Sequence, residues 1–505
     1  MEFDMKKVAV LVMILSCATG LHAELRLAKV FTDNAVLQRQ RPVPVWGWTA
    51  PGKTVTVTFH GSQVSATANA DGKFLAYLPS MEANASGSNL VVSASGETSV
   101  TLANIVVGEV WLCSGQSNMA RTMGFDESKG YTNRTTDMAA ANYPSIRYFD
   151  PAFDFSDTPL DDLDGRQNYG KKWQVVTPVS VYDTYSLAYY FARDIHTNLN
   201  VPVGLLQLAL SGSSIQPWVP ADKLLFCYAD YNNSVSDYWT YRDKNGGRSN
   251  EWPVTVASWA AAWDAVAATN GTQFPAKPIS STFGSDYYKL EGPGVMYNAL
   301  HYPVAPYAVR GGLWFQGEAN QVSGGGNYLH MLKYMVEGWR ERWGQDFFFI
   351  AGQIAPAPPE MDSEWQPIPI TIGTGRPFLL EDFLLSDSFG TSNFATTVNI
   401  DLYNHFSNFS PAVMSQNGVH YEAKDKAGRR MALTARARVY GETNLIYKGP
   451  VCTNSIVQGS QIRLQFGELA GGLVINSTAQ RTNGFAITGS TGVNKTWYFA
   501  DVVQD

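Results

Sequence analysis

Residues 105–119 read Ile105-Val106-Val107-Gly108-Glu109-Val110-Trp111-Leu112-Cys113-Ser114-Gly115-Gln116-Ser117-Asn118-Met119, and this stretch decides the fold. It is strongly apolar up to Leu112 and then changes abruptly to small and polar residues. A continuous apolar run bounded by turn residues is typical of a buried strand. The polar end of such a strand, on a turn flanked by glycine, is where many hydrolases present a nucleophile. We therefore predict a buried strand that places Ser117 at its end.

The length and composition of the chain indicate a large multidomain protein. With 505 residues it is too long for one ordinary domain, and a prior of roughly 150 residues per domain predicts about three. Hydrophobic residues make up 45% of the chain, which is ample for large cores, whereas only 16% of its residues are charged. The net charge is −7 and no basic run occurs, which argues against a nucleic-acid partner.

Residues 1–23 have the pattern of an export signal. Lys6-Lys7 precede an apolar run over Val8–Leu15, and small residues follow that allow cleavage after Ala23. The apolar run is too short to span a bilayer, and no other segment is predicted to be transmembrane. We therefore expect a signal peptide and export to the periplasm or the extracellular space. Lipidation of the exported protein at Cys17 is the alternative.

Three cysteines remain after such a cleavage, namely Cys113, Cys227 and Cys452. A sparse, odd-numbered set cannot build a disulfide scaffold. At most one disulfide pair can form, and we expect three buried thiols.

Residues 24–104 are predicted to form an all-β domain. Thr54–Phe59 alternates polar and apolar residues with a period of two, and similar short segments are separated by Gly, Pro and Asp turns. This spacing is typical of a β-sandwich. Gly47–Thr54 matches the phosphate-loop pattern GxxxxGK followed by Ser or Thr. The strand-like alternation after it and Pro51 within it favour a hairpin turn instead, because a phosphate loop needs a helix and free backbone amides.

From residue 105 to about 440 the pattern changes. Apolar runs alternate with segments of helical spacing over Ser186–Leu199, Val203–Leu210, Val309–Phe315, Asn327–Trp343 and Phe347–Ile354. Fully apolar strands between helices are typical of a parallel sheet covered on both faces. A helix around Lys426–Tyr440 is expected to end this α/β domain. Residues 441–505 return to alternating patterns and are predicted to be a C-terminal β region.

A serine needs a base that removes its proton before it can attack, and histidine is the usual choice. His420 stands just before the predicted last helix of the α/β domain, in a loop at the carboxyl ends of the strands. Ligands bind at that edge of open α/β sheets. His420 is therefore the predicted base for Ser117, and His405 is the second candidate.

An oxyanion intermediate also needs hydrogen-bond donors near Ser117, and the backbone amide of Ser117 is itself one candidate. Polar turns follow two other predicted strands, at Ser211–Trp218 and Gln316–Asn320. Three polar strand ends, followed by a histidine before the last helix, form one consistent pattern. This pattern predicts a hydrolase site at the carboxyl edge of the sheet.

Several motifs resemble those of the sialate O-acetylesterase family, which belongs to the wider SGNH or GDSL-type hydrolases. They are Asp33–Arg39, Val45–Trp48, Gly115–Met119, Trp314–Asn320, Val419-His420 with Lys424, and Gly428-Arg429-Arg430. The resemblance covers nearly the whole chain after the leader. It implies a three-layer α/β/α, flavodoxin-like catalytic domain over residues 105–440 with flanking all-β domains. It also implies Ser117 as nucleophile, His420 as general base, and Gln316 as an oxyanion donor beside the Gly212 turn.

The chain departs from the SGNH pattern where the third member of a catalytic triad is expected. That group usually carries Asp three residues before the histidine, and here this position is Asn417. Another group must then orient His420, or the enzyme works with a Ser–His dyad. Glu318 and Asp401 are the candidate acids.

Two smaller departures follow from the same resemblance. Ser211 stands where relatives often have Gly, which weakens the expected contact from Gly212. Relatives often continue beyond the position of Asp505, so a shortened β region over 441–505 is expected.

The sequence therefore predicts an exported carbohydrate esterase that removes O-acetyl groups from sugars through an acetyl-enzyme. Met119 replaces the second Gly of the Gly-x-Ser-x-Gly elbow, which argues against the common α/β-hydrolase fold. No HExxH or paired CxxC pattern occurs, so neither a metal nor a cofactor is expected. The substrate is either O-acetyl sialic acid or an acetylated plant polysaccharide such as xylan or pectin, since acetylxylan esterases share these motifs. The alternatives are a non-catalytic carbohydrate-binding protein and a peptidase that uses the same dyad, although nothing in the sequence indicates a peptide groove.

Overall fold

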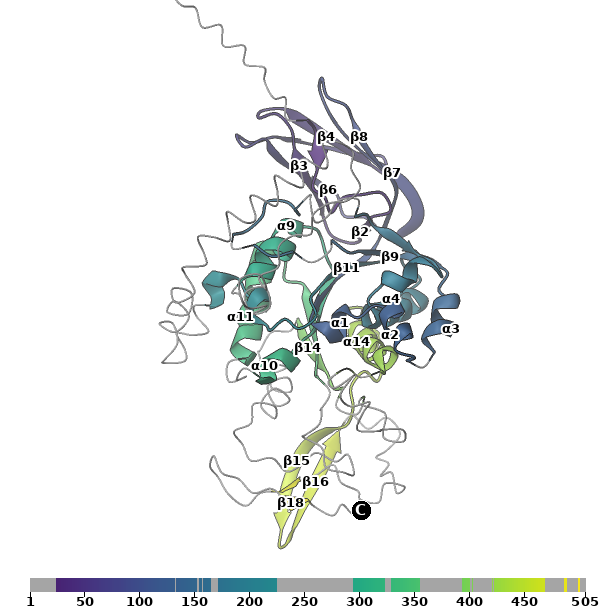
Figure 1. The fold of residues 1–505 in the computed structure, drawn as a ribbon, viewed down its shortest axis with the longest axis vertical. Coiled ribbons are helices and arrows are strands. Elements are labelled where there is room, and N and C mark those ends of the chain that lie inside the picture. Colours follow the sequence, from purple (N-terminus) through teal and green to yellow (C-terminus); the bar gives the residue numbers. More distant parts are fainter. Residues whose placement is uncertain are drawn as a thin grey trace, which may run out of the picture.

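The computed structural model describes residues 24–131, 133–151, 154–156, 158–164, 171–224, 294–322, 328–354, 393–399, 402, 420, 422–467, 486–487 and 498–499 (Figure 1). The expected leader, Cys227, His405, Asp401 and Asn417 lie outside these residues.

The N-terminal region consists of two groups of strands. One is a three-stranded sheet of β1 (Arg26–Leu27), β3 (Val43–Trp48) and β6 (Lys73–Leu78). The other joins the large sheet and contains β2 (Val36–Gln38), β4 (Thr54–Phe59), β5 (Ser62–Thr67) and β7 (Asn84–Ala94).

The turn between Trp48 and Thr54 differs from the predicted hairpin. β3 pairs with β1 and β6, whereas β4 pairs with β5 and β7. The turn therefore carries the chain from one sheet to the other. The alternation in Thr54–Phe59 has the expected cause, because Val55, Val57 and Phe59 are buried.

The strand β8 (Val100–Gly115) runs through both regions of the protein. Its first part pairs antiparallel with β7 as far as Val107. Its second part lies between β11 (Val203–Ala209) and β12 (Gly311–Phe315), and both pairings are parallel. The predicted domain boundary at residue 105 thus falls inside one continuous strand.

The α/β region contains a largely parallel sheet in the order β10-β9-β11-β8-β12-β13-β14. Its remaining strands are β9 (Tyr143–Phe149), β10 (Gln174–Val176), β13 (Phe348–Gly352) and β14 (Phe394–Thr397). Every residue of β11, β12 and β13 is buried, since both faces of the sheet are covered. In Figure 1 the sheet separates α11 (Tyr328–Trp343) on one side from α4 (Ser186–Leu199) and α14 (Lys424–Arg438) on the other. The α/β fold with additional β regions is thereby confirmed.

Shorter helices connect these elements. They are α1 (Ser117–Ala120), α2 (Met123–Ser128), α3 (Arg134–Ala139), η1 (Ser180–Asp183), η2 (Gln216–Trp218), η4 (Tyr297–His301), α9 (Tyr302–Val304) and α10 (Glu318–Val322). Two hairpins, β15–β16 (Val451–Gln458 and Gln461–Gly467) and β17–β18 (Ala486–Ile487 and Tyr498–Phe499), follow α14. Within the described parts of the chain, no helix combines the length and the apolar content needed to cross a bilayer.

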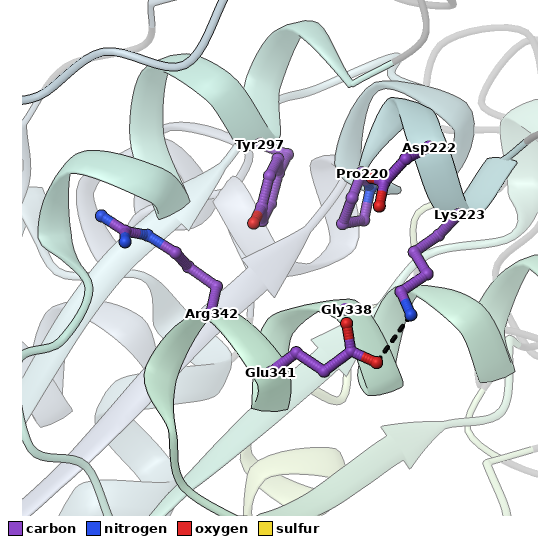
Figure 2. A pocket seen from close by; sticks show the side chains of 7 residues that line it. All are labelled: Pro220, Asp222, Lys223, Tyr297, Gly338, Glu341 and Arg342. Atoms are coloured by element: carbon purple, nitrogen blue, oxygen red, sulfur yellow. Dashed lines mark hydrogen bonds and ion pairs between the residues drawn. The ribbon is translucent and has the colours of Figure 1, made fainter.

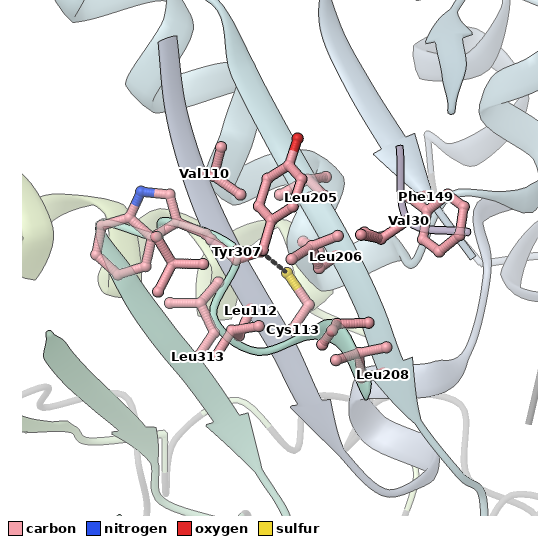
Figure 3. Packing of buried hydrophobic residues seen from close by; sticks show 14 of the residues in the cluster. Val30, Val110, Leu112, Cys113, Phe149, Leu205, Leu206, Leu208, Tyr307 and Leu313 are labelled. Atoms are coloured by element: carbon pink, nitrogen blue, oxygen red, sulfur yellow. Dashed lines mark hydrogen bonds between the residues drawn. The ribbon is translucent and has the colours of Figure 1, made fainter. Parts of the chain in front are cut away.

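The core is built around the inner strands of the sheet. Figure 3 shows Cys113 of β8 among aliphatic side chains that include Leu206 and Leu208 of β11 and Leu313 of β12. Burial raises the pKa of the Cys113 thiol, so this cysteine is chemically inert and serves as a packing residue. Cys452, in contrast, is exposed, as are all the other residues of β15. The expectation of three buried thiols is therefore wrong for Cys452.

Candidate active site

The end of β8 forms a tight turn that leads into Ser117. Gly115 has a φ of +137°, which L side chains rarely adopt, and a Cβ there would lie 2.1 Å from the carbonyl oxygen of Phe315 on β12. The backbone N–H of Gln116 donates to the same carbonyl at 3.0 Å. Glycine therefore allows β8 and β12 to approach closely, and α1 starts at Ser117 directly after this contact.

Ser117 and His420 meet at a cleft beside this turn. The Nε2 atom of His420 lies 2.7 Å from the Oγ atom of Ser117, which is hydrogen-bonding distance. The cleft has a volume of about 790 Å³ and is lined by Gln116, Ser117, Ala120, Arg121, Thr122, Phe125, Ser211, Gly212, Glu318, Ala319 and His420. The two residues that the sequence predicts as nucleophile and base are thus brought together from positions 303 residues apart.

Two side chains that no sequence motif signals hold the segment that carries His420. Arg134 of α3 is buried, and its Nη2 atom donates to the carbonyl oxygen of Glu422 at 2.6 Å. The hydroxyl of Tyr131 lies 3.5 Å from the carbonyl oxygen of His420, a long contact. Because both partners are backbone carbonyls, these contacts fix the path of the chain just before α14.

The turn after β11 brings Gly212 to the cleft. Gly212 has a φ of +81°, and together with Ser211 it lines the cleft beside Ser117. The N–H of Leu210 donates to the carbonyl oxygen of Gly115 at 3.0 Å and joins this turn to the one that precedes Ser117. The serine at position 211 therefore does not keep Gly212 away from the site.

Gln316 is placed differently from its predicted role. Its side chain is fully buried and does not line the cleft. Its Nε2 atom lies 3.1 Å from Oε1 of Gln116, 3.1 Å from the carbonyl oxygen of Ser213 and 2.7 Å from Oδ1 of Asn320. An amide nitrogen has two hydrogens to donate, and these three acceptors use them inside the protein. Gln316 therefore ties the three strand ends together, and it does not point a donor at Ser117.

Glu318 belongs to a buried polar chain that the sequence does not reveal. Its Oε1 atom accepts a hydrogen bond from Nδ2 of Asn118, and Oδ1 of Asn118 accepts one from Nζ of Lys424. Burial raises the pKa of the Glu318 carboxyl group, whereas the Asn118 hydrogen bond and the Lys424 charge lower it. Burial also lowers the pKa of Lys424, against the opposing charges of Asp126 and Glu318. The chain links the residue after the nucleophile to the helix after the base.

A second, smaller cavity of about 330 Å³ lies beside α11 and shares no residue with the cleft (Figure 2). Of the four charged side chains that line it, Lys223 and Glu341 form an ion pair with an N–O distance of 2.6 Å, and Asp222 and Arg342 carry opposite charges. Among the described residues, no cluster of His, Cys, Asp and Glu side chains is suited to hold a metal ion.

Comparisons with known proteins show similarity to carbohydrate esterases. The family model described as "Carbohydrate esterase, sialic acid-specific acetylesterase" matches residues 107–238. The sialate O-acetylesterase of Mus musculus is 26% identical over 453 residues, which cover 83% of this chain and 75% of the mouse protein. That of Homo sapiens is 23% identical over 452 residues, covering 84% of this chain and 73% of the human protein.

A solved structure extends the likeness to the fold. A carbohydrate acetylesterase from Xanthomonas citri superimposes with a TM-score of 0.68 at 24% identity, covering 95% of this chain and 89% of that one. The shared fold includes the flanking regions as well as the α/β sheet, since nearly the whole chain is aligned. The resemblance predicted from the motifs is confirmed: the chain is a carboxylic ester hydrolase that resembles the sialate O-acetylesterases and other carbohydrate esterases.

Proposed function

We propose that this protein removes O-acetyl groups from sugars, with Ser117 as the nucleophile and His420 as the general base. The observation that carries the proposal is the 2.7 Å contact between Ser117 Oγ and His420 Nε2 at the wall of the cleft. A serine hydroxyl becomes a useful nucleophile when a base within hydrogen-bond reach takes its proton. The sialate O-acetylesterases and the carbohydrate acetylesterase that the chain resembles support a sugar ester as the substrate.

The reaction proceeds in two halves. Ser117 Oγ attacks the acetyl carbonyl carbon while His420 takes the serine proton, and the backbone amides of Ser117 and Gly212 donate to the oxyanion. When the tetrahedral intermediate collapses, the sugar oxygen leaves with the proton from His420, and the acetyl group stays on Ser117. His420 then takes a proton from a water molecule that attacks the acetyl-enzyme. Acetate leaves, and the proton returns to Ser117.

The group that orients His420 is one of the two candidate acids, Asp401 and Glu318, or the enzyme works with a Ser–His dyad. The hydrogen bond of Glu318 to Asn118 supports an indirect role for this carboxylate, because it acts on the residue beside Ser117. Asp401→Asn and Glu318→Gln should be compared in steady-state kinetics. A triad acid should lower kcat by roughly 10⁴-fold when it is neutralised. If both variants retain the wild-type kcat, the dyad is supported.

Acetate release tests the function directly. The wild-type protein should be assayed on 9-O-acetyl sialic acid, acetylated xylan and acetylated pectin, beside Ser117→Ala and His420→Gln. Removal of the nucleophile or the base should lower kcat by on the order of 10⁴- to 10⁶-fold. Activity that survives in Ser117→Ala would refute the mechanism. The substrate from which acetate is released fastest distinguishes a sialate esterase from a polysaccharide deacetylase. A non-catalytic carbohydrate-binding protein would release no acetate from any of them.

Export is a further part of the proposal. The basic and apolar pattern of residues 1–23 supports cleavage after Ala23, and Cys17 offers lipidation as the alternative. The N-terminal sequence and intact mass of the protein purified from cell fractions distinguish the two. Soluble export gives a chain that starts at Glu24, whereas lipidation gives a membrane-bound form that Cys17→Ser releases.

A further inference from the structure

Arg121 is a cation at the wall of the cleft. It follows α1, four residues after Ser117, and its N–H donates to the carbonyl oxygen of Ser117 at 3.0 Å. Its Nη1 atom donates to the hydroxyl of Tyr131 at 3.1 Å, and its guanidinium group lies 4.6 Å from the centre of the Phe125 ring. These two contacts hold the guanidinium group in one place while its side chain still lines the cleft.

Arg121 has no carboxylate partner among the residues that the structure describes. Two other half-buried arginines do have one. Arg310 pairs with Glu109 at 2.7 Å, and Arg436 pairs with Glu442 at 2.8 Å. The carboxylate whose charge acts on Arg121 is Asp126, which is fully buried and has Arg134 at 3.7 Å.

Electrostatics agree with this geometry. Burial lowers the pKa of Arg121, and the attraction of Tyr131 and Asp126 offsets it only in part. The hydrogen bond to Glu442, in contrast, raises the pKa of Arg436. A guanidinium group that is partly desolvated and not neutralised attracts an anion.

We propose that Arg121 binds the carboxylate of an acidic sugar while Ser117 attacks an acetyl ester on the same molecule. The inference rests on the proposed function and narrows its substrate class. A guanidinium group matches a carboxylate with two parallel hydrogen bonds, and its flat face can stay stacked on Phe125 meanwhile. Ser117 and Arg121 line the same cleft, so one sugar molecule bound there can contact both side chains. Sialic acids and the uronic acids of pectin carry such a carboxylate, whereas acetylated xylose units do not.

The test compares each acid with its neutral amide. The substrate pairs are O-acetyl sialic acid with its carboxamide, and acetylated oligogalacturonic acid with its carboxamide. The measured quantity is the ratio of kcat/KM for the acid to kcat/KM for the amide. We expect a ratio of about 10 to 100 in the wild type for the pair that fits, and a ratio near one in Arg121→Gln. Arg121→Lys should lie between them, because lysine keeps the charge and loses the two-pronged geometry.

Lys129→Gln is the matched control. Lys129 also lies over the Phe125 ring, 5.4 Å from its centre, but it is exposed and does not line the cleft. It should keep the wild-type ratio. A ratio that is the same in wild type and Arg121→Gln overturns the proposal. An equal fall of kcat/KM for the acid and for the amide in Arg121→Gln also overturns it, because such a fall indicates a purely structural role for Arg121.

Failure of the proposed function can be told apart from failure of this inference. If the wild type hydrolyses 4-nitrophenyl acetate but none of the sugars, the assignment to sugar esters fails. The role of Arg121 is then read from competitive inhibition of 4-nitrophenyl acetate hydrolysis by free sialic acid and galacturonic acid against their amides. The carboxylate site is supported if the acids inhibit the wild type more tightly than their amides and if Arg121→Gln removes this difference. Equal inhibition of the wild type by acids and amides refutes it.

Discussion

Replacement of Lys424 by Met should destabilise the protein and slow catalysis together. Lys424 is fully buried, and its ammonium group donates to Asn118, which in turn donates to Glu318. Methionine has a similar length and suits a helix, so the change removes the charge with little change in packing. It leaves the Glu318 carboxylate without its counter-charge and the Asn118 oxygen without this donor.

The structure sets the expected size of both effects. Stranding one member of a buried charge pair costs about 3–5 kcal/mol of the free energy of unfolding. The lower end applies here, since Glu318, whose pKa burial raises, can take up a proton instead. Asn118 is adjacent to Ser117, and a shift of the nucleophile by about 1 Å costs on the order of 10²-fold in rate. We therefore expect kcat to fall about 10- to 100-fold, with a smaller change in KM.

The assay is a double-mutant cycle with Glu318→Gln. Urea unfolding and 4-nitrophenyl acetate kinetics should be measured for the wild type, both single variants and the double variant. Neutralising Glu318 in the Lys424→Met background should restore about 1–3 kcal/mol. Lys426→Met is the control, because Lys426 is exposed on the same helix and should change the stability by less than about 0.5 kcal/mol. The reasoning is refuted if Lys424→Met behaves like Lys426→Met, or if the two single effects simply add.

Three further changes have defined outcomes. Glu109→Gln should lower the free energy of urea unfolding by about 3–5 kcal/mol, because the fully buried carboxylate of Glu109 accepts from both Arg39 and Arg310; its kcat should stay close to that of the wild type. Burial lowers the pKa of His301 to about 3, so below pH 6.5 the unfolded chain binds a proton that the folded chain does not. The contribution of His301 to the free energy of unfolding is therefore present above pH 6.5 and is lost as the pH falls, by about 2 kcal/mol at pH 5. His301→Gln should flatten that part of the curve of unfolding free energy against pH. Gly115→Ala should lower kcat on 4-nitrophenyl acetate at least about 100-fold, since its Cβ would lie 2.1 Å from a carbonyl oxygen; near-normal kinetics would contradict the close approach.

Periodicity was sufficient to predict several of the main elements of the α/β region. The helix expected over Ser186–Leu199 is α4 with the same bounds, and the apolar run at Val309–Phe315 contains β12. Such patterns are informative because a strand covered on both faces must be apolar throughout. The same reasoning placed Ser117 and His420 at one edge of the sheet, where the structure brings them into contact.

Other features depend on tertiary structure and leave no local signal. A turn signal between Trp48 and Thr54 shows that the chain reverses, but it does not show which strand each end pairs with. A polar residue at a strand end, such as Gln316, can face either a cleft or the neighbouring strand ends. Lysine is almost never fully buried, so nothing in the sequence marks Lys424 as an interior residue.

The continuity of β8 restricts how proteins of this architecture can exchange parts. Removing residues 24–104 would strip β8 of its β7 partner and leave an open strand edge at the start of the segment that carries Ser117. The N-terminal strands therefore cannot be swapped as a cassette at residue 105 without also replacing the strand that holds the nucleophile. Recombination between related esterases should tolerate junctions in the turns on either side of β8, and it should fail at junctions within it.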